Sequence, residues 1–181
     1  MSFTFSRRSF LKYTAVAAVA VAGASLFTGC KIDTSDSYNA LRTTPGELTV
    51  LQVTAAMGTY VEASKSYTGP VVTGKTIAFP FKITNGRANP IYVTPNNFKA
   101  TVLDAEGKVI LAKYTASNGL SLEPSLCDTN LKKDASVSGK VTLTLAPDAT
   151  LKAGQSIVLT YCPDLQYNEY SLNWKTTRAK G

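Results

Sequence analysis

The sequence predicts an all-β sandwich of about eight short strands that occupies residues 47–176. Three observations favour this fold class. From Glu47 onward no segment keeps a helical apolar period over ten residues. Apolar residues recur instead at every second position, and turn-forming residues separate these runs at the spacing of sandwich strands.

The strongest strand pattern covers Lys75–Thr84. Its apolar side chains share one face: Ile77, Phe79, Phe81 and Ile83. Pro80 interrupts this run, and because proline has no N–H to donate, we expect the strand to lie at a sheet edge or to bulge there. The other expected strands are Leu48–Val53, Tyr60–Ala63, Ile91–Thr94, Phe98–Leu103, Val109–Tyr114, 140–145, Ser156–Cys162 and Tyr170–Lys175.

The expected core comes from the same alternation. Further inward-facing side chains are Val141, Leu143, Tyr170, Leu172 and Trp174. Tyr167 lies instead in a polar segment and is the better surface candidate. A core of this kind leaves little interior for a pocket.

The N-terminus reads as an export signal over residues 1–29. Arg7 and Arg8 precede Phe-Leu-Lys, as in the twin-arginine export consensus, which a receptor reads as an address. The apolar stretch from Ala15 to Phe27 has about 13 residues, whereas a membrane-spanning helix needs roughly 20.

Leu26–Cys30 then resembles a lipobox, with Phe27 where leucine is usual. We expect Cys30 to carry a diacylglycerol thioether, and two acyl chains suffice for stable anchoring. Residues 30–46 are predicted to be this lipidated cysteine and a flexible polar tether. The expected location is the outer face of the cell membrane, or the outer membrane if the cell has one. An unprocessed or merely secreted protein is the alternative.

Charge and composition argue against several function classes. The net charge of +7 falls to +4 once the three basic residues of the signal are removed, and the charges are scattered, so no nucleic-acid surface is expected. Residues 177–181 read as a basic, solubilising tail. The chain has no histidine, the usual general base and the commonest metal ligand. We therefore expect no metal, no cofactor and no enzymatic activity.

Cys127 and Cys162 form an even pair once Cys30 is assigned to the anchor. In an oxidising compartment such a pair predicts a disulfide, which would close a long loop. Two free thiols are the alternative.

Two further motifs resemble ligand-binding sequences but are better explained as turns. Gly69–Thr76 satisfies the P-loop pattern, but that chemistry needs a helix after the loop, and here a strand pattern containing Pro80 follows. No nucleotide binding is expected. Asp104, Glu106 and Gly107 suggest calcium only weakly, and a hairpin turn is the better interpretation.

The order of these elements resembles a known family. The segments that carry the resemblance are ELTVLQVTAA, GKTIAFPFKITN, PNNFKATVLDAEGK, SGKVTLTLA and a late strand ending in aromatic residues. It is similar to bacterial extracellular immunoglobulin-like lipoproteins of unknown function, which are related to a secreted immunoprotective antigen of actinobacteria. The resemblance covers roughly residues 47–176. It implies an immunoglobulin-like sandwich and supplies no catalytic residues.

The sequence thus favours a surface-anchored, non-catalytic binding module with a protein or cell-envelope partner. Recognition is expected in the loops 85–90 and 164–169, with Arg87, Asn89 and Tyr167 as candidate binding residues. One alternative is an accessory scaffold or chaperone lipoprotein that docks on a membrane complex. Another is a small carbohydrate-active hydrolase, which would need a pair of carboxylates in a groove.

Overall fold

The computed structural model describes residues 39–167 and 170–179. They belong to the second of two compact units, Thr34–Gly181. The predicted signal residues Arg7 and Arg8 and the predicted lipidation site Cys30 lie outside the described residues.

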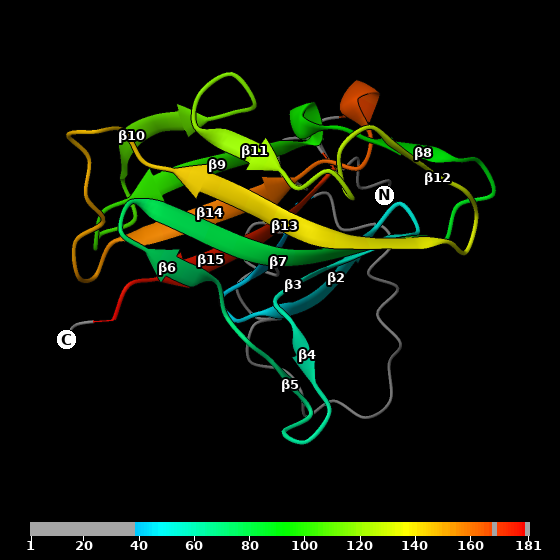
Figure 1. Ribbon diagram of the computed structural model, residues 1–181, viewed down its shortest axis with the longest axis horizontal. Coiled ribbons are helices and arrows are strands. Elements are labelled where there is room, and N and C mark those ends of the chain that lie inside the picture. Colours follow the sequence, from blue (N-terminus) through cyan, green and yellow to red (C-terminus); the bar gives the residue numbers. More distant parts are fainter. Residues whose placement is uncertain (1–38, 168–169, 180–181) are drawn as a thin grey trace, which may run out of the picture. The chain divides into compact units, whose positions relative to one another are not determined.

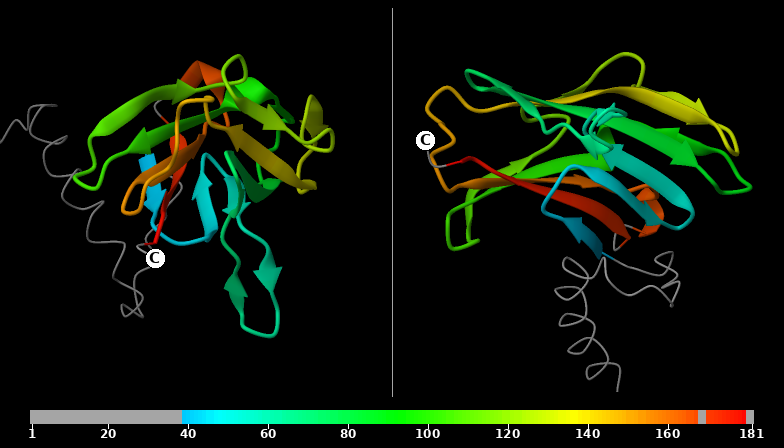
Figure 2. Two further views of the ribbon diagram at one scale, coloured as in Figure 1. Left: turned by 60° about the vertical axis from the view of Figure 1, so that its left-hand side comes forward. Right: turned by 90° about the horizontal axis from the view of Figure 1, so that it is seen from below.

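The described residues form an all-β, immunoglobulin-like sandwich of two sheets, which confirms the predicted fold class (Figure 1). Figure 2 shows the sheets as two layers with their strands packed face to face. The first sheet has the order β1 (Asn39–Arg42), β15 (Ser171–Thr177), β14 (Ser156–Tyr161), β9 (Phe98–Leu103) and β10 (Val109–Tyr114).

The second sheet has the order β11 (Leu120–Leu122), β13 (Ser136–Thr144), β7 (Thr76–Asn85), β3 (Val53–Met57) and β2 (Gly46–Val50), and β6 (Val71–Thr73) also pairs with β7. Two short ribbons complete the fold: β8 (Ile91–Val93) with β12 (Thr129–Leu131), and β4 (Tyr60–Val61) with β5 (Ser66–Tyr67). Two 3-10 turns, η3 (Pro95–Asn97) and η4 (Leu165–Tyr167), lie in connections.

The core lies between the sheets, on the faces that the period-two pattern predicts. The four apolar side chains of β7 are each at most 2% exposed. Phe81 packs edge-on against Trp174, with ring centroids 5.1 Å apart, and also against Phe98 and Tyr161. The Trp174 indole donates to the Gly46 carbonyl at 2.9 Å, so its one polar atom is satisfied inside the core. Each fully buried side chain of this size contributes about 1.5–3 kcal/mol of hydrophobic stabilisation.

Tyr161 is fully buried, and its hydroxyl has no hydrogen-bond partner among the described residues. An unsatisfied buried hydroxyl opposes folding. We therefore expect Tyr161→Phe to raise the free energy of unfolding by up to about 1 kcal/mol in a denaturant titration. Tyr67→Phe is the opposite control, since it removes a hydroxyl that donates to Glu47. A loss of more than about 1 kcal/mol in Tyr161→Phe would contradict this expectation.

The expectation that Pro80 marks an edge or a bulge is wrong. β7 is a central strand, with β13 along one side and both β3 and β6 along the other. The pairing with β3 ends at Phe81 and the pairing with β6 begins at Ala78, so Pro80 faces the gap between them. Its carbonyl accepts the Gly58 N–H at 2.8 Å, on the same side. The missing N–H of Pro80 therefore breaks no ladder bond.

The expected single strand Leu48–Val53 is two strands. β2 ends at Val50 and β3 begins at Val53, while Leu51 and Gln52 form a two-residue turn with φ of 49° and 59°. Positive φ at both positions is typical of a type I′ hairpin, which usually carries Asn-Gly. Leu-Gln therefore carried no turn signal.

The predicted tether extends too far along the chain. β1 pairs in parallel with β15 at an edge of the first sheet, so the domain begins by Asn39 and not at Glu47. The Asn173 amide donates to the Ala40 carbonyl at 3.1 Å, and the Ser171 hydroxyl donates to the Asn39 side chain. The polar composition that suggested a tether suits an edge strand equally well.

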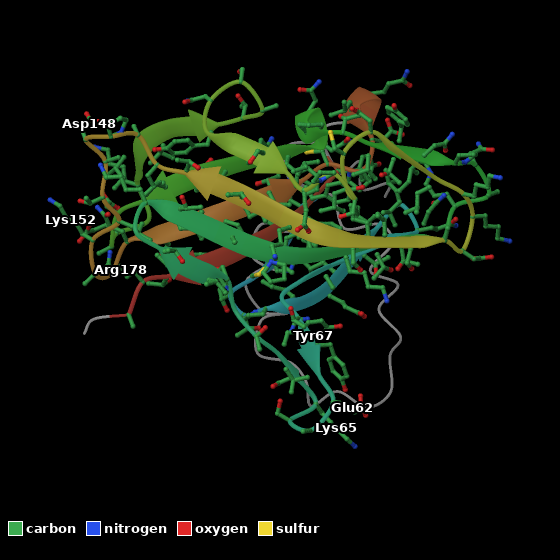
Figure 3. All side chains as sticks on the ribbon, viewed as in Figure 1. Glu62, Lys65, Tyr67, Asp148, Lys152 and Arg178 are labelled. Carbon is green, nitrogen blue, oxygen red and sulfur yellow. The ribbon has the colours of Figure 1, made fainter. Side chains whose placement is uncertain are left out.

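The start of the predicted basic tail is also part of the fold. β15 continues to Thr177, and the backbone N–H of Arg178 donates to the Gln155 carbonyl at 2.9 Å. The Arg178 guanidinium donates to the Leu151 carbonyl. Figure 3 shows Arg178 at the end of the sandwich where Asp148 and Lys152 also lie.

The P-loop-like segment 69–76 and the acidic segment at Asp104 both contain turns. Gly74 and Lys75 connect β6 to β7, so the P-loop-like segment is followed by a strand and not by a helix. Asp104 closes the turn between β9 and β10: its carboxylate accepts the Lys108 N–H at 2.7 Å, and its carbonyl accepts the Gly107 N–H.

Candidate functional site

The two predicted binding loops meet in space. Arg87 follows β7 and Asp164 follows β14, and their side chains form an ion pair at 3.1 Å. They are 30% and 20% exposed, respectively, so the pair is partly shielded from solvent. Arg87 is therefore occupied within the fold, and its contact joins the two loops.

Asn85 organises the first of these loops from a fully buried position at the end of β7. Its amide donates to the carbonyls of Leu131 and Asn89 at 2.9 and 3.0 Å, and its side-chain oxygen accepts the Arg87 N–H at 2.9 Å. The side chain of Asn89 is exposed. Tyr167 ends η4. The Asn85 side chain thus ties the loop to β12 and to its own backbone.

The predicted disulfide is wrong: Cys127 and Cys162 are both free thiols. The Cys127 thiol donates to the adjacent Asp128 carboxylate at 3.4 Å, and Cys162 is buried at the end of β14. A disulfide needs two cysteines with closely matched Cβ positions. Loop length and compartment, on which the prediction depended, carry no information about that geometry.

Thiol titration checks this correction. We expect the denatured, unreduced Cys30→Ala chain to react with two equivalents of a thiol reagent. In the folded protein Cys127 should react first, because Cys162 is only 5% exposed. Both should react slowly at neutral pH, since desolvation and the Asp128 carboxylate raise the pKa of Cys127 and burial raises the pKa of Cys162. If the denatured chain contained no reactive thiol, Cys127 and Cys162 would be joined by a disulfide after all.

A groove of about 680 Å³ lies on the outer face of the second sheet, beneath the β4–β5 hairpin. We call it the hairpin groove. Its lining residues are Glu47, Ala56, Gly58, Thr59, Tyr60, Tyr67, Pro80, Phe81, Lys82, Glu123, Ser138, Gly139 and Lys140. They come from four neighbouring strands of the sheet, from the hairpin and from the segment after β11.

The floor of the groove is hollow because small side chains alternate with long ones across it. The pairing register places Ala56 beside Lys82, and Lys82 beside Ser138. In the next row Pro80 is paired with Lys140 on one side and bonded to Gly58 on the other. Alanine, serine, glycine and proline leave space between the lysines that project from the sheet.

The wall of the groove is the β4–β5 hairpin, which projects away from both sheets (Figures 1 and 2). Its neck is fixed by Gly58, where φ is +104° and a Cβ atom would lie 2.2 Å from the Thr68 carbonyl oxygen. The Thr68 N–H donates to the Thr59 carbonyl at 2.9 Å. Only glycine fits this position, since both its φ and its close backbone approach exclude a side chain.

Two tyrosines place aromatic surface on this wall. The rings of Tyr60 and Tyr67 are 5.2 Å apart and tilted by 59°. The Tyr67 hydroxyl donates to the Glu47 carboxylate on β2 at 2.8 Å, which ties the hairpin to the sheet. Figure 3 shows Tyr67 nearer the sheets than Glu62 and Lys65 at the hairpin turn. Burial and the hydrogen bond to Glu47 raise the pKa of Tyr67 to about 12, so its hydroxyl stays a donor at every physiological pH.

The charges in the groove are of both signs. Lys140 forms an ion pair with Glu123 at 3.7 Å, and Glu47 accepts the Tyr67 hydroxyl. Sequence reasoning missed this site, although Gly58 and the Gly69-Pro70 pair enclose a polar segment with two tyrosines. That pattern marks an excursion from the sheet but does not say which outer-face side chains lie beneath it.

The described residues contain neither a cluster of metal ligands nor a membrane-spanning helix. Within residues 39–167 and 170–179, no three Cys, Asp or Glu side chains gather as a metal site would require. In the same part of the chain, no helix is long and apolar enough to cross a membrane.

A search of the curated proteins returns no match. Among solved structures the chain is similar to the yjhA protein from Bacillus subtilis, at 10% identity and a TM-score of 0.41 over 73% of this chain and 95% of that chain. It is also similar to a putative lipoprotein (ycdA) from Bacillus subtilis subsp. subtilis str. 168, at 13% identity and a TM-score of 0.43 over 74% and 39%. A third similar structure is a family 123 glycoside hydrolase from Clostridium perfringens. Its identity is 12% and its TM-score is 0.39, over 71% of this chain and 28% of that chain.

At these identities and TM-scores, the structural likenesses carry no argument about function. The signal region is different. Residues 4–24 match the TAT (twin-arginine translocation) pathway signal sequence, and this segment contains Arg7 and Arg8. The comparisons therefore support export by the twin-arginine route, as the sequence predicts.

Proposed function

We propose that this exported protein is anchored by lipid at Cys30 and acts as a non-catalytic binding module whose recognition surface is the hairpin groove. The observation that supports it is the groove itself, where an aromatic wall stands over a floor of charged and small side chains. Binding sites for small ligands combine such apolar surface with a few placed polar groups. The groove replaces the loops at Arg87 and Tyr167 as the proposed recognition surface.

Co-sedimentation with isolated cell envelope, freed of membrane lipid, tests this function. The Cys30→Ala chain removes the anchor as a cause of binding. We expect Tyr60→Ala to lower the bound fraction at least about fivefold, because Tyr60 is 47% exposed on the groove wall. Tyr92→Ala is the matched control, a 56% exposed tyrosine on β8 outside the groove, and should bind as the parent does. Equal binding by both variants would contradict the proposal.

A small hydrolase is the second candidate, because Glu47 and Glu123 line one groove. Two features favour binding over catalysis. A general acid needs a carboxyl group in a shielded, apolar setting, whereas Glu47 is exposed and the Glu123 side chain is 42% exposed. Each carboxylate also already has a partner, in Tyr67 and Lys140. Turnover of any glycan in a panel, abolished by Glu47→Gln or Glu123→Gln, would establish the hydrolase instead.

A further inference from the structure

Lys82 lines the hairpin groove without an ion pair among the described residues. It projects from the outer face of β7, between Ala56 on β3 and Ser138 on β13. Among the described residues its ammonium group makes no ion pair and no hydrogen bond, although its side chain lines the groove. An unpaired cation between two small side chains is accessible to an anionic ligand group.

The other charged side chains that line the groove are Glu47, Glu123 and Lys140. Glu123 is paired with Lys140 at 3.7 Å, and Glu47 accepts the Tyr67 hydroxyl at 2.8 Å. The groove therefore offers one lysine without an ion pair and two carboxylates that can still accept hydrogen bonds, and Glu47 keeps its negative charge because a neutral hydroxyl does not offset it. One lysine matches the single charge of a carboxylate, whereas a phosphate dianion is usually held by several donors or cations.

A ligand on the floor of the groove contacts side chains only, because the backbone groups of the floor strands are paired within the sheet. β7 pairs with β13 from Thr76 to Thr84, and with β3 and β6 along its other side. An extended peptide that binds by strand addition needs a free sheet edge. Around Lys82 the floor is the face of the paired strands β3, β7 and β13, which offers side chains and no free edge, so this part of the groove favours a ligand rich in hydroxyl groups over a peptide strand.

The wall provides the complementary apolar contact. Tyr60 is 47% exposed, and its ring is tilted by 59° from that of Tyr67. The face of an aromatic ring carries negative electrostatic potential and packs well against polarised C–H groups. The C–H face of a sugar ring has this character, and its hydroxyls can donate to carboxylates such as Glu47 and Glu123.

We propose that the hairpin groove binds a carboxylate-bearing saccharide, with a sugar ring packed on Tyr60 and the acid group paired with Lys82. This inference rests on the proposed function and names its ligand class. The occupant is thus an acidic sugar of the uronic-acid type, and the pairing is electrostatic, so added salt weakens it.

A matched pair of ligands and a matched pair of variants test the inference. The probes are a galacturonic acid tetramer and its methyl ester, which has the same sugar backbone without charge, titrated calorimetrically into the full Cys30→Ala chain. We expect the acid to bind about five- to tenfold tighter than the ester. Lys82→Gln should remove this preference, so that acid and ester bind alike. Lys133→Gln makes the same charge change on an exposed turn and should keep the preference.

The outcomes separate the ligand class from the groove itself. Tyr60→Ala should weaken acid and ester equally, by about tenfold. Equal binding of acid and ester by the parent chain, or an acid preference that survives Lys82→Gln, would overturn the acidic saccharide while leaving the groove as a binding surface. The same holds if neither tetramer binds but envelope co-sedimentation still depends on Tyr60. If Tyr60→Ala binds the envelope as well as the parent chain does, the proposed function is overturned as well.

Discussion

Asn85→Ala is expected to lower the free energy of unfolding by about 3 kcal/mol, the largest effect we expect from a single polar side chain in this fold. Asn85 is fully buried and satisfies three backbone groups, the carbonyls of Leu131 and Asn89 and the N–H of Arg87. Alanine leaves these three groups without their partner, and each buried unsatisfied group opposes folding by about 1–3 kcal/mol, less whatever water recovers.

Denaturant unfolding, with the transition midpoint and slope measured together, checks this expectation. Asn85→Asp is a near-isosteric variant that keeps an acceptor for Arg87 but cannot donate to two carbonyls, so it should be at least as destabilising at neutral pH. Asn89→Ala is the control, because only the backbone carbonyl of Asn89 takes part and its side chain is exposed. Its effect should stay within about 0.5 kcal/mol. An Asn85→Ala loss below about 1 kcal/mol would mean that water replaces the amide.

Export is expected to stop when Arg7 and Arg8 are both replaced by lysine, and lipid attachment when Cys30 is replaced by alanine. Lysine keeps the charge but lacks the planar guanidinium fork, and a receptor reads the arginine pair as an address. The double variant should accumulate as precursor in the cytoplasm. Cys30→Ala should still cross the membrane, but it should take up no labelled fatty acid and should no longer be retained by the anchor.

Fractionation and metabolic labelling with a fatty acid measure the two effects separately. Lys31→Arg, next to the acylation site, is the control for the signal variants and should be exported and labelled normally. Unchanged labelling of Cys30→Ala would refute lipidation at this residue. Normal export of the double lysine variant would show that another route carries the chain.

The face that each strand residue presents could be predicted from the sequence, because side chains alternate with a local period of two. The inward faces of β7, β13 and β15 follow it, and Leu143, Leu172 and Trp174 are completely buried. Tyr170 packs against this core while partly buried. The hairpin turn at Asp104 was equally local, since its bonds join residues at most four apart.

Pairing partners could not be predicted in the same way. Pro80 looked like an edge residue, yet it lies in a central strand because β3 and β6 share one side of β7 and leave a gap at its nitrogen. β1 looked like a tether because its contacts are with β15, some 130 positions away in the chain. The predicted disulfide between Cys127 and Cys162 was wrong for a related reason. The spacing of two thiols in the sequence says nothing about their distance in space.

What the sequence determined by itself is therefore what depends on neighbours in the chain: the twin-arginine signal, the all-β class, the inward faces and the local turns. The tertiary structure alone decided the candidate site. Glu47, Lys82, Glu123 and Lys140 lie on different segments and become neighbours only through strand order and register. The hairpin stands over them because Gly58 turns the chain out of the sheet opposite Pro80. Strand order follows from how two sheets bury their apolar faces together, and a period-two pattern marks the face of a strand without naming the strand beside it.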